Sequence, residues 1–161
     1  MSNKLSNAIT AHFNDLFFQG GWTGVNLKDV LADVTLNEAN TVCEGFNSVA
    51  QVTNHLSYYY PIQLKVFRGG DVEGHDSESW KIDAPKTEEE WRDIVSSLLD
   101  YGREMIAAIE GINDGQMFAG FDKSGKYGTV QRNLIGIIEH TYYHLGQIVI
   151  LKKLVRQSQS N

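Results

Sequence analysis

Four long stretches of the sequence place apolar residues three and four positions apart, the spacing that gathers them on one face of an α-helix. Strict alternation of apolar and polar residues, which is typical of half-buried strands, is hard to find over the length of a strand. Helices with one apolar face are stable in water when those faces pack around a shared core. The pattern therefore predicts an all-α protein, a four-helix bundle that forms a single domain over residues 1–161.

Each predicted helix has a start or stop signal at its ends. The first helix, over about residues 3–18, ends before Gly20-Gly21, and the second starts at the cap Asn47-Ser48 with Gln51. The third helix starts at Thr87 with Glu90 and ends near Gly111. The last helix starts at Thr129, and its C-terminal end carries the basic residues Lys152, Lys153 and Arg156. Pro61 lies inside the second helix, where its missing N–H predicts a bend.

Three long segments connect these helices. Residues 22–44 hold two short helix-like pieces, the second introduced by Thr35 and Glu38 in the spacing of a capping box. Residues 68–86 and 113–128 are rich in glycine and polar residues and are predicted to be loops. Connections of this length allow a crossover, so the simple up-down-up-down order is not required.

The charge balance disfavours two classes of partner. The chain has 14 basic and 20 acidic residues, a net charge of −6, which repels nucleic-acid phosphates and anionic lipid surfaces. The most apolar stretch, residues 134–151, contains the costly polar groups Glu139, His140, His144 and Gln147, so it does not suit a lipid-facing span. We therefore expect no nucleic-acid partner and no membrane partner.

Cysteine usage and the N-terminal residues indicate the compartment. Cys43 is the single cysteine, so no internal disulfide can form and a reducing compartment fits. Its place in a connector favours a small packing residue over a nucleophile. Residues 1–7 lack the apolar core of a secretory signal, and we expect a cytoplasmic protein.

Two histidines occupy core positions of the last predicted helix. The inward stripe of that helix consists of Ile137, His140, His144, Ile148, Leu151 and Val155. Their i, i+4 spacing stacks the two imidazoles with β-carbons roughly 5–6 Å apart, so both can reach one metal ion. His55 lies on the inward stripe of the second helix. Three imidazoles from two facing helices predict a divalent-metal site that keeps positions open for water or substrate.

A lone histidine is more often a hydrogen-bonded core or surface residue than a metal ligand. Three on inward faces favour the metal, because burying each imidazole without a partner costs about 2–3 kcal/mol or more and one ion satisfies all three. His12 lies on the stripe of the first helix and is a candidate fourth ligand, whereas His75 lies in a polar loop and is expected to be solvated. The tyrosines at 58–60 and 142–143 either line the cavity or pack between helices.

Other site patterns fit less well. A di-iron bundle needs a glutamate three residues before a histidine, and the zincin motif needs one directly after His140, where Thr141 stands. Glu139 points about 100° away from His140 and is expected to face solvent or another helix. Residues 120–127 come close to a P-loop, but Tyr127 replaces the required Ser or Thr and no buried strand precedes them, so they are interpreted as a mobile loop.

The histidine pattern resembles that of a known family. It consists of Asn54-His55-Leu56 on the second helix and an HxxxHxGQI motif over residues 140–148 on the last. These residues and the helix order, over essentially the whole chain, resemble the DinB/YfiT-like superfamily. The resemblance implies a bundle in up-down-down-up order, often a homodimer, with zinc or nickel bound by the three histidines. It also implies a thiol transferase or isomerase or a metal-dependent hydrolase, although many relatives have no assigned reaction.

The residues leave three kinds of function open. The first is a metalloenzyme in which His55, His140 and His144 hold an ion that ionises a thiol or water. Because helical spacing places no carboxylate beside the histidines, transfer of a thiol to a small-molecule substrate ranks above hydrolysis, and no catalytic residue besides the ligands can be assigned. The second is a non-catalytic metal or small-ligand binding protein, and the third is a helical partner-binding module with incidental histidines.

Overall fold

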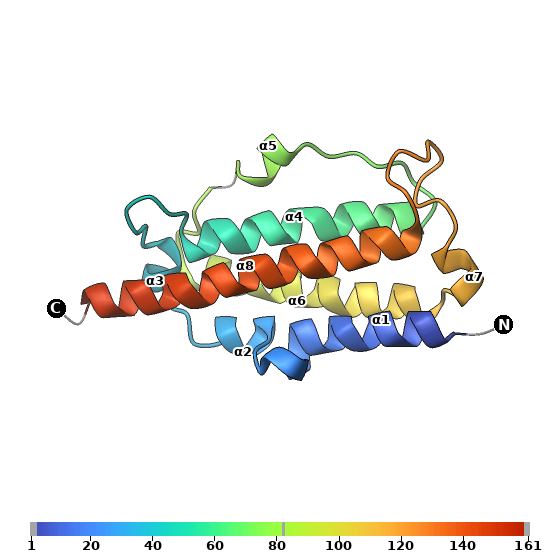
Figure 1. Cartoon of the computed structure of the whole chain (residues 1–161). Helices are drawn as coiled ribbons and strands as arrows, with labels where there is room; N and C mark the ends of the chain where they lie inside the picture. Colours follow the sequence, from blue (N-terminus) through green and yellow to red (C-terminus); the bar gives the residue numbers. More distant parts are fainter. Residues whose placement is uncertain (1–2, 82, 160–161) are drawn as a thin grey trace.

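The computed structural model describes residues 3–81 and 83–159, and these form a bundle of helices (Figure 1). Its long helices are α1 (Lys4–Asn14), α4 (Val49–Phe67), α6 (Glu88–Glu110) and α8 (Val130–Gln159). Within the described residues there is no strand, only an isolated antiparallel bridge between Gly120 and Thr129. The predicted all-α fold is confirmed.

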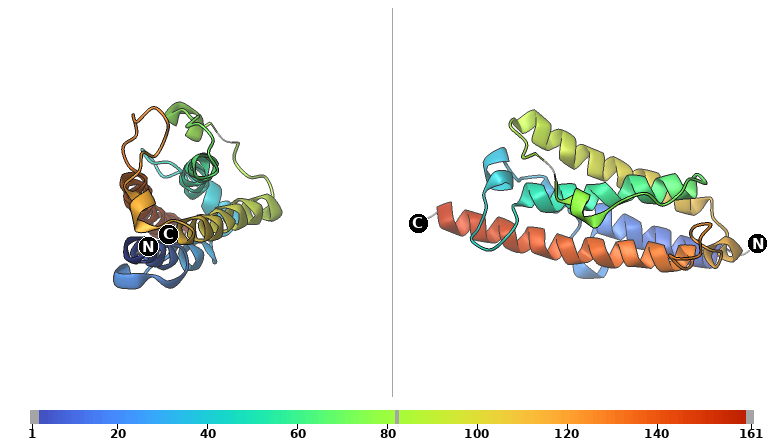
Figure 2. Two further views of the ribbon diagram at one scale, coloured as in Figure 1. Left: turned by 90° about the vertical axis from the view of Figure 1, so that its right-hand side faces the viewer. Right: turned by 90° about the horizontal axis from the view of Figure 1, so that it is seen from above.

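The order of the four long helices is up-down-down-up. In Figure 1, α1 and α8 run in one direction and α4 and α6 in the other. Helix α4 packs against α6 and α8, and α1 packs against the same two helices. The end-on view of Figure 2 shows the four helices around a shared interior. The long connections make this crossover possible.

Most of the predicted helix starts are confirmed by side-chain caps. Ser48 and Gln51 form a complete capping box at the start of α4. Thr87 Oγ1 accepts from the N–H of Glu90 at α6, and Thr129 Oγ1 accepts from the N–H of Arg132 at α8. Each cap satisfies an amide that has no partner inside its own helix, so it fixes where the helix begins.

The end of the first helix differs from the prediction. After Asn14 the chain continues as a π-helical turn, η1 (Asp15–Gln19), which Gly20 ends with φ +91°. The large rings of Phe13 and Phe17 are buried there, whereas His12 is exposed. The prediction that His12 lies on the inward stripe was wrong, because the phenylalanines bury more apolar surface and rotate the core-facing side away from it.

The connectors contain short elements. Residues 21–40 form the 3₁₀ turn η2 (Gly21–Thr23) and the helices α2 (Leu27–Leu31) and α3 (Leu36–Asn40). The predicted capping box of Thr35 and Glu38 opens α3. The predicted loops hold two further short helices, α5 (Asp76–Ser79) and α7 (Asp114–Met117). Helix α5 lies over the outer side of α4 in Figure 1.

A buried polar contact joins α4 to α8 inside the apolar core. The Thr141 hydroxyl donates to the carbonyl of Ile137 at 2.7 Å, so the Tyr60 hydroxyl, 2.6 Å from Thr141 Oγ1, donates to that oxygen. Both residues have zero exposure. None of the helices in the described part of the chain is sufficiently long and apolar to cross a bilayer.

Candidate metal centre

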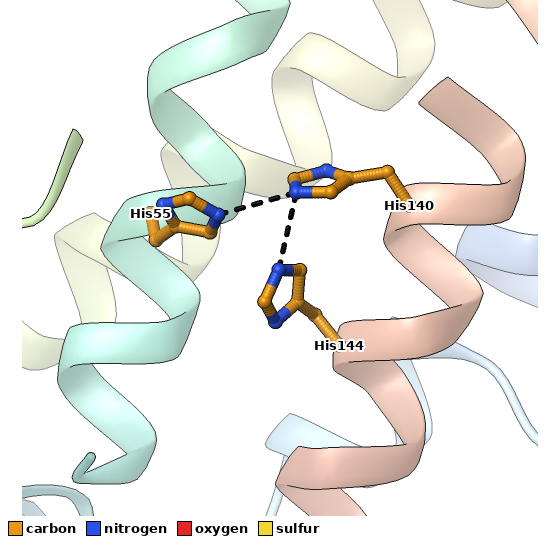
Figure 3. Close-up of side chains that lie close together, drawn as sticks. All are labelled: His55, His140 and His144. Carbon is orange, nitrogen blue, oxygen red and sulfur yellow. Dashed lines mark hydrogen bonds between the residues drawn. The ribbon is translucent and has the colours of Figure 1, made fainter. Parts of the chain in front are cut away.

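Three histidine side chains meet between α4 and α8 (Figure 3). His55 comes from α4, and His140 and His144 come from successive turns of α8, since residues four apart share a helix face. His55 and His144 are 3% and 5% exposed, and His140 is half-buried. The structure therefore brings together the three histidines that the sequence analysis selected.

The Nε2 atoms of the three rings converge. Nε2 of His140 lies 3.2 Å from Nε2 of His55 and 3.1 Å from Nε2 of His144, and all three ligand atoms lie within 4.8 Å of one another. An ion held at roughly 2.0–2.1 Å by tetrahedral ligands separates their nitrogens by about 3.3 Å. The donor set therefore fits an ion of this size. Among the residues that the structure describes, no carboxylate or thiol joins this group.

Two of the rings have polar partners at Nδ1. Nδ1 of His144 lies 2.7 Å from Oε1 of Gln147, one turn further along α8. Nδ1 of His55 lies 2.7 Å from Oγ of Ser79, which ends α5. Such outer partners orient metal-binding imidazoles in proteins. The Gly-Gln pair of the sequence motif thus contributes a side chain that contacts a candidate ligand.

The imidazoles are neutral at neutral pH. Burial, together with the neighbouring His144, lowers the pKa of both His55 and His140 to about 4. Burial also lowers the pKa of His144. The negative charge of Asp76 opposes these shifts in His55 and His140 without cancelling them. The neutral ring is the form that binds a metal ion.

Aromatic rings enclose the centre. The indole of Trp80 stacks on His55 with ring centroids 3.8 Å apart and an interplanar angle of 14°. The ring of Tyr59 meets His55 and His140 edge-on, at centroid distances of 5.2 and 5.1 Å. These contacts limit the rotation of the imidazoles and exclude water from two sides. Of the tyrosines that were expected to line the cavity or to pack between helices, Tyr59 therefore lines the centre, whereas Tyr60 packs inside the bundle.

A pocket of about 490 Å³ opens beside His140. It is bounded by α4, α5, the N-terminal turns of α8 and the loop before them, through Tyr59, Gln63, Asp76, Tyr127, Arg132, Asn133, Gly136 and Ile137. Gly136 lines this pocket, and a Cβ added there would have the Arg132 guanidinium as its nearest neighbour, at 3.8 Å. The centre is thus reachable from the His140 side by a small molecule.

Three residues of the site were missed by the sequence analysis: Asp76, Ser79 and Trp80. All lie in the segment that was predicted to be an open loop, and their contacts with α4 depend on how the chain folds back. The only local signal is the pair of acids at the start of α5, which suits a helix N-terminus but does not indicate a site. Helical spacing places no carboxylate beside the histidines, but the folded chain brings Asp76 from α5 into the same pocket as His140.

The other candidate residues lie elsewhere. His12 and His75 are both exposed, and neither belongs to the histidine group. Cys43 is half-buried in the connector before α4. The P-loop-like segment forms a turn in which the Asp122 carboxylate accepts a hydrogen bond from the backbone N–H of Ser124. In a P-loop, backbone N–H groups of this kind bind phosphate instead.

Comparisons with known proteins support one family. The family model described as "DinB family" matches residues 1–157. A search of curated proteins and a search of solved structures gave no match.

Proposed function

The chain belongs to the DinB family, and we propose that it binds one divalent metal ion through the Nε2 atoms of His55, His140 and His144. The observation that carries the proposal is the convergence of three neutral imidazole nitrogens, two of them only 3.1 and 3.2 Å from the third. Without an ion, three such nitrogens share too few protons to satisfy one another. We propose zinc or nickel, because imidazole ligands suit both ions.

Metal analysis of the purified protein tests this assignment. We expect about one zinc or nickel ion per chain after dialysis against a weak chelator. His144→Ala should lose stoichiometric binding, because two imidazole ligands alone bind a divalent ion too weakly. His12→Ala is the matched control, since His12 is exposed and lies outside the group. Metal content that is equal in the two variants would overturn the assignment.

We propose further that the protein is an enzyme that transfers a thiol to an electrophilic small molecule. A divalent ion at this centre supplies the Lewis acidity that ionises a thiol near neutral pH. The pocket beside His140 has the volume of a small-molecule site and leads to the least buried of the three rings. Trp80 and Tyr59 cover other sides of the centre. Arg132, which also pairs with Glu139 at 3.6 Å, places a positive charge at the pocket for an anionic group of the substrate.

Metal-dependent hydrolysis is the second candidate reaction, and Asp76 favours it. The Asp76 carboxylate lies in the same pocket, where its charge partly opposes the lowering of the pKa of His55 and His140. A carboxylate beside a metal centre can take the proton of a water molecule. It also accepts a hydrogen bond from the Tyr59 hydroxyl, which holds it in place. We therefore propose Asp76 as the base if the protein is a hydrolase.

A substrate panel separates the two reactions. The metal-loaded protein is given low-molecular-weight thiols with a chromogenic electrophile and, in parallel, chromogenic esters and amides. Thiol conjugation that survives Asp76→Asn supports the transferase, whereas ester cleavage that Asp76→Asn abolishes supports the hydrolase. No turnover in either assay, with metal bound, supports a non-catalytic metal or small-ligand binding protein.

A pair of glycine variants tests the pocket. Gly136→Leu should lower turnover by filling the pocket beside His140, while the metal content stays at one ion per chain. Gly136→Ala is the matched control, because its methyl group changes the same helix position but fills little of the pocket and meets no atom nearer than 3.8 Å. Equal turnover in the two variants would place the substrate elsewhere.

We also propose a homodimer, as the family resemblance implies. The outer face of α8 supports this assembly, since Tyr143 and Ile150 are 64% and 57% exposed there. Large apolar side chains on one exposed helix face often mark an interface. Light scattering at tens of micromolar should give twice the 18.1 kDa mass of the chain, and the monomer mass would contradict the proposal.

A further inference from the structure

The segment of residues 75–80, which contains α5, reaches over α4 and contacts His55 in two ways. Ser79 is fully buried, and its Oγ lies 2.7 Å from Nδ1 of His55. Trp80 covers one face of the same imidazole. His55 thus receives its Nδ1 partner from outside the long helices, unlike His144, whose partner Gln147 belongs to the same helix.

Two tyrosines of α4 hold this segment in place. The Tyr58 hydroxyl accepts from the backbone N–H of His75 at 2.9 Å and donates to the Glu78 carboxylate at 3.1 Å. The Tyr59 hydroxyl donates to the Asp76 carboxylate. These three hydrogen bonds, to residues 75, 76 and 78, fix the position of Ser79 relative to α4, so its contact with His55 is built into the fold.

The direction of the Ser79–His55 hydrogen bond follows from proton counting. The Ser79 hydroxyl has one proton, which it donates to the carbonyl oxygen of Asp76 at 2.6 Å. A carbonyl oxygen can only accept, so Ser79 Oγ faces Nδ1 of His55 as an acceptor and Nδ1 carries the proton. A neutral imidazole has a single N–H, and therefore Nε2 of His55 presents its lone pair to His140 and His144.

We propose that Ser79 is a positioning residue that holds His55 in the Nδ1–H tautomer and so keeps Nε2 ready for a metal ion; the inference rests on the proposed metal site. Without the acceptor at Nδ1, the proton can move to Nε2 and be donated to Nε2 of His140, which lies 3.2 Å away. That proton occupies the lone pair that the metal requires. Loss of such an outer partner costs roughly 10- to 100-fold in metal affinity.

The test compares two serines of the same short helix. Ser79→Ala removes the acceptor, and Ser77→Ala makes the same chemical change at an exposed position of α5. The first readout is the tautomer of His55 in the metal-free protein at neutral pH, from long-range ¹H–¹⁵N correlation spectra assigned with His55→Gln. The second is the dissociation constant for zinc, measured by competition with a chromogenic chelator.

We expect an Nδ1–H tautomer of His55 in the wild type and in Ser77→Ala, and a shift towards Nε2–H in Ser79→Ala. Zinc affinity should fall roughly 10- to 100-fold in Ser79→Ala and stay within twofold in Ser77→Ala. An Nε2–H tautomer in the wild type would overturn the proposal without any variant, and so would an unchanged tautomer and affinity in Ser79→Ala. If the wild type binds no metal, the proposed function fails, while the spectra still decide the role of Ser79.

Discussion

Replacing Glu38 by Gln should remove an ion pair that ties α3 to the end of α8. The Glu38 side chain is 11% exposed, and its carboxylate accepts from Nε of Arg156 at 2.5 Å and from the N–H of Thr35 at 2.8 Å. The hydrogen bond from Arg156, with the bonds from Thr35, holds the pKa of Glu38 at about 2, against an ordinary 4.5. The carboxylate is therefore ionised in the folded protein well below the pH at which it is protonated in the unfolded chain.

The sign and size of the effect follow from this difference in pKa. A lowered pKa stabilises the fold above the unfolded value of 4.5, and the gain is lost as the pH falls towards 2. The difference corresponds to an upper bound of about 3 kcal/mol in the free energy of unfolding, at roughly 1.4 kcal/mol per pKa unit. Because the Arg156 side chain is 41% exposed, solvent screens the pair and we expect about 2 kcal/mol.

Urea unfolding at two pH values measures the effect. At pH 7 the variant Glu38→Gln should be less stable than the wild type by about 2 kcal/mol, and at pH 2.5 the difference should shrink to about a quarter of that. Glu44→Gln is the control for removing one carboxylate, because Glu44 is exposed. A destabilisation of equal size at both pH values would refute the reasoning, since it would not depend on the ionised carboxylate.

Two further outcomes are expected. Gly102→Ala should destabilise the fold by about 1–3 kcal/mol in thermal unfolding, because its Cβ would overlap the ring of Phe17, whereas Gly146→Ala, in open space on α8, should be neutral or slightly stabilising. Since the pKa values of His55 and His140 are about 4, their neutral forms persist above that pH. The pKa of His144 is lowered as well, so zinc affinity measured by chelator competition should fall from pH 7.5 to 5.5 by far less than the roughly thousandfold that three rings of ordinary pKa would give.

The sequence predicts the long helices and the histidine cluster because both depend on local spacing. The caps at Ser48 and Thr129 are chosen by residues within three positions, and His140 and His144 share a face whatever surrounds them. The inward position of His55 follows from the same periodicity. These features need no knowledge of which helices are neighbours.

The surroundings of the centre could not be predicted, because they depend on contacts between segments. Helix α5 has only four residues and little helical preference of its own, and the hydroxyls of Tyr58 and Tyr59 hold it. Nothing near Ser79 in the sequence indicates that it lies against His55. The wrong prediction for His12 has a similar origin, since only packing against α6 and α8 decides which side of α1 is buried.

The cap of α1 comes from a residue that is synthesised long after the helix itself. Both carboxylate oxygens of Asp114 accept from the first amides of α1, at Lys4 and Leu5, and Asp114 follows Lys4 by 110 residues. At a ribosomal rate of about 5–20 residues per second, this cap is made roughly 5–20 s after the helix that needs it. Helix α8, which also covers α1, is made later still. Until α6 and then α8 have been made, the apolar face of α1, with Phe13 and Phe17, lacks most of its native neighbours, so the nascent chain exposes apolar surface that the finished protein buries.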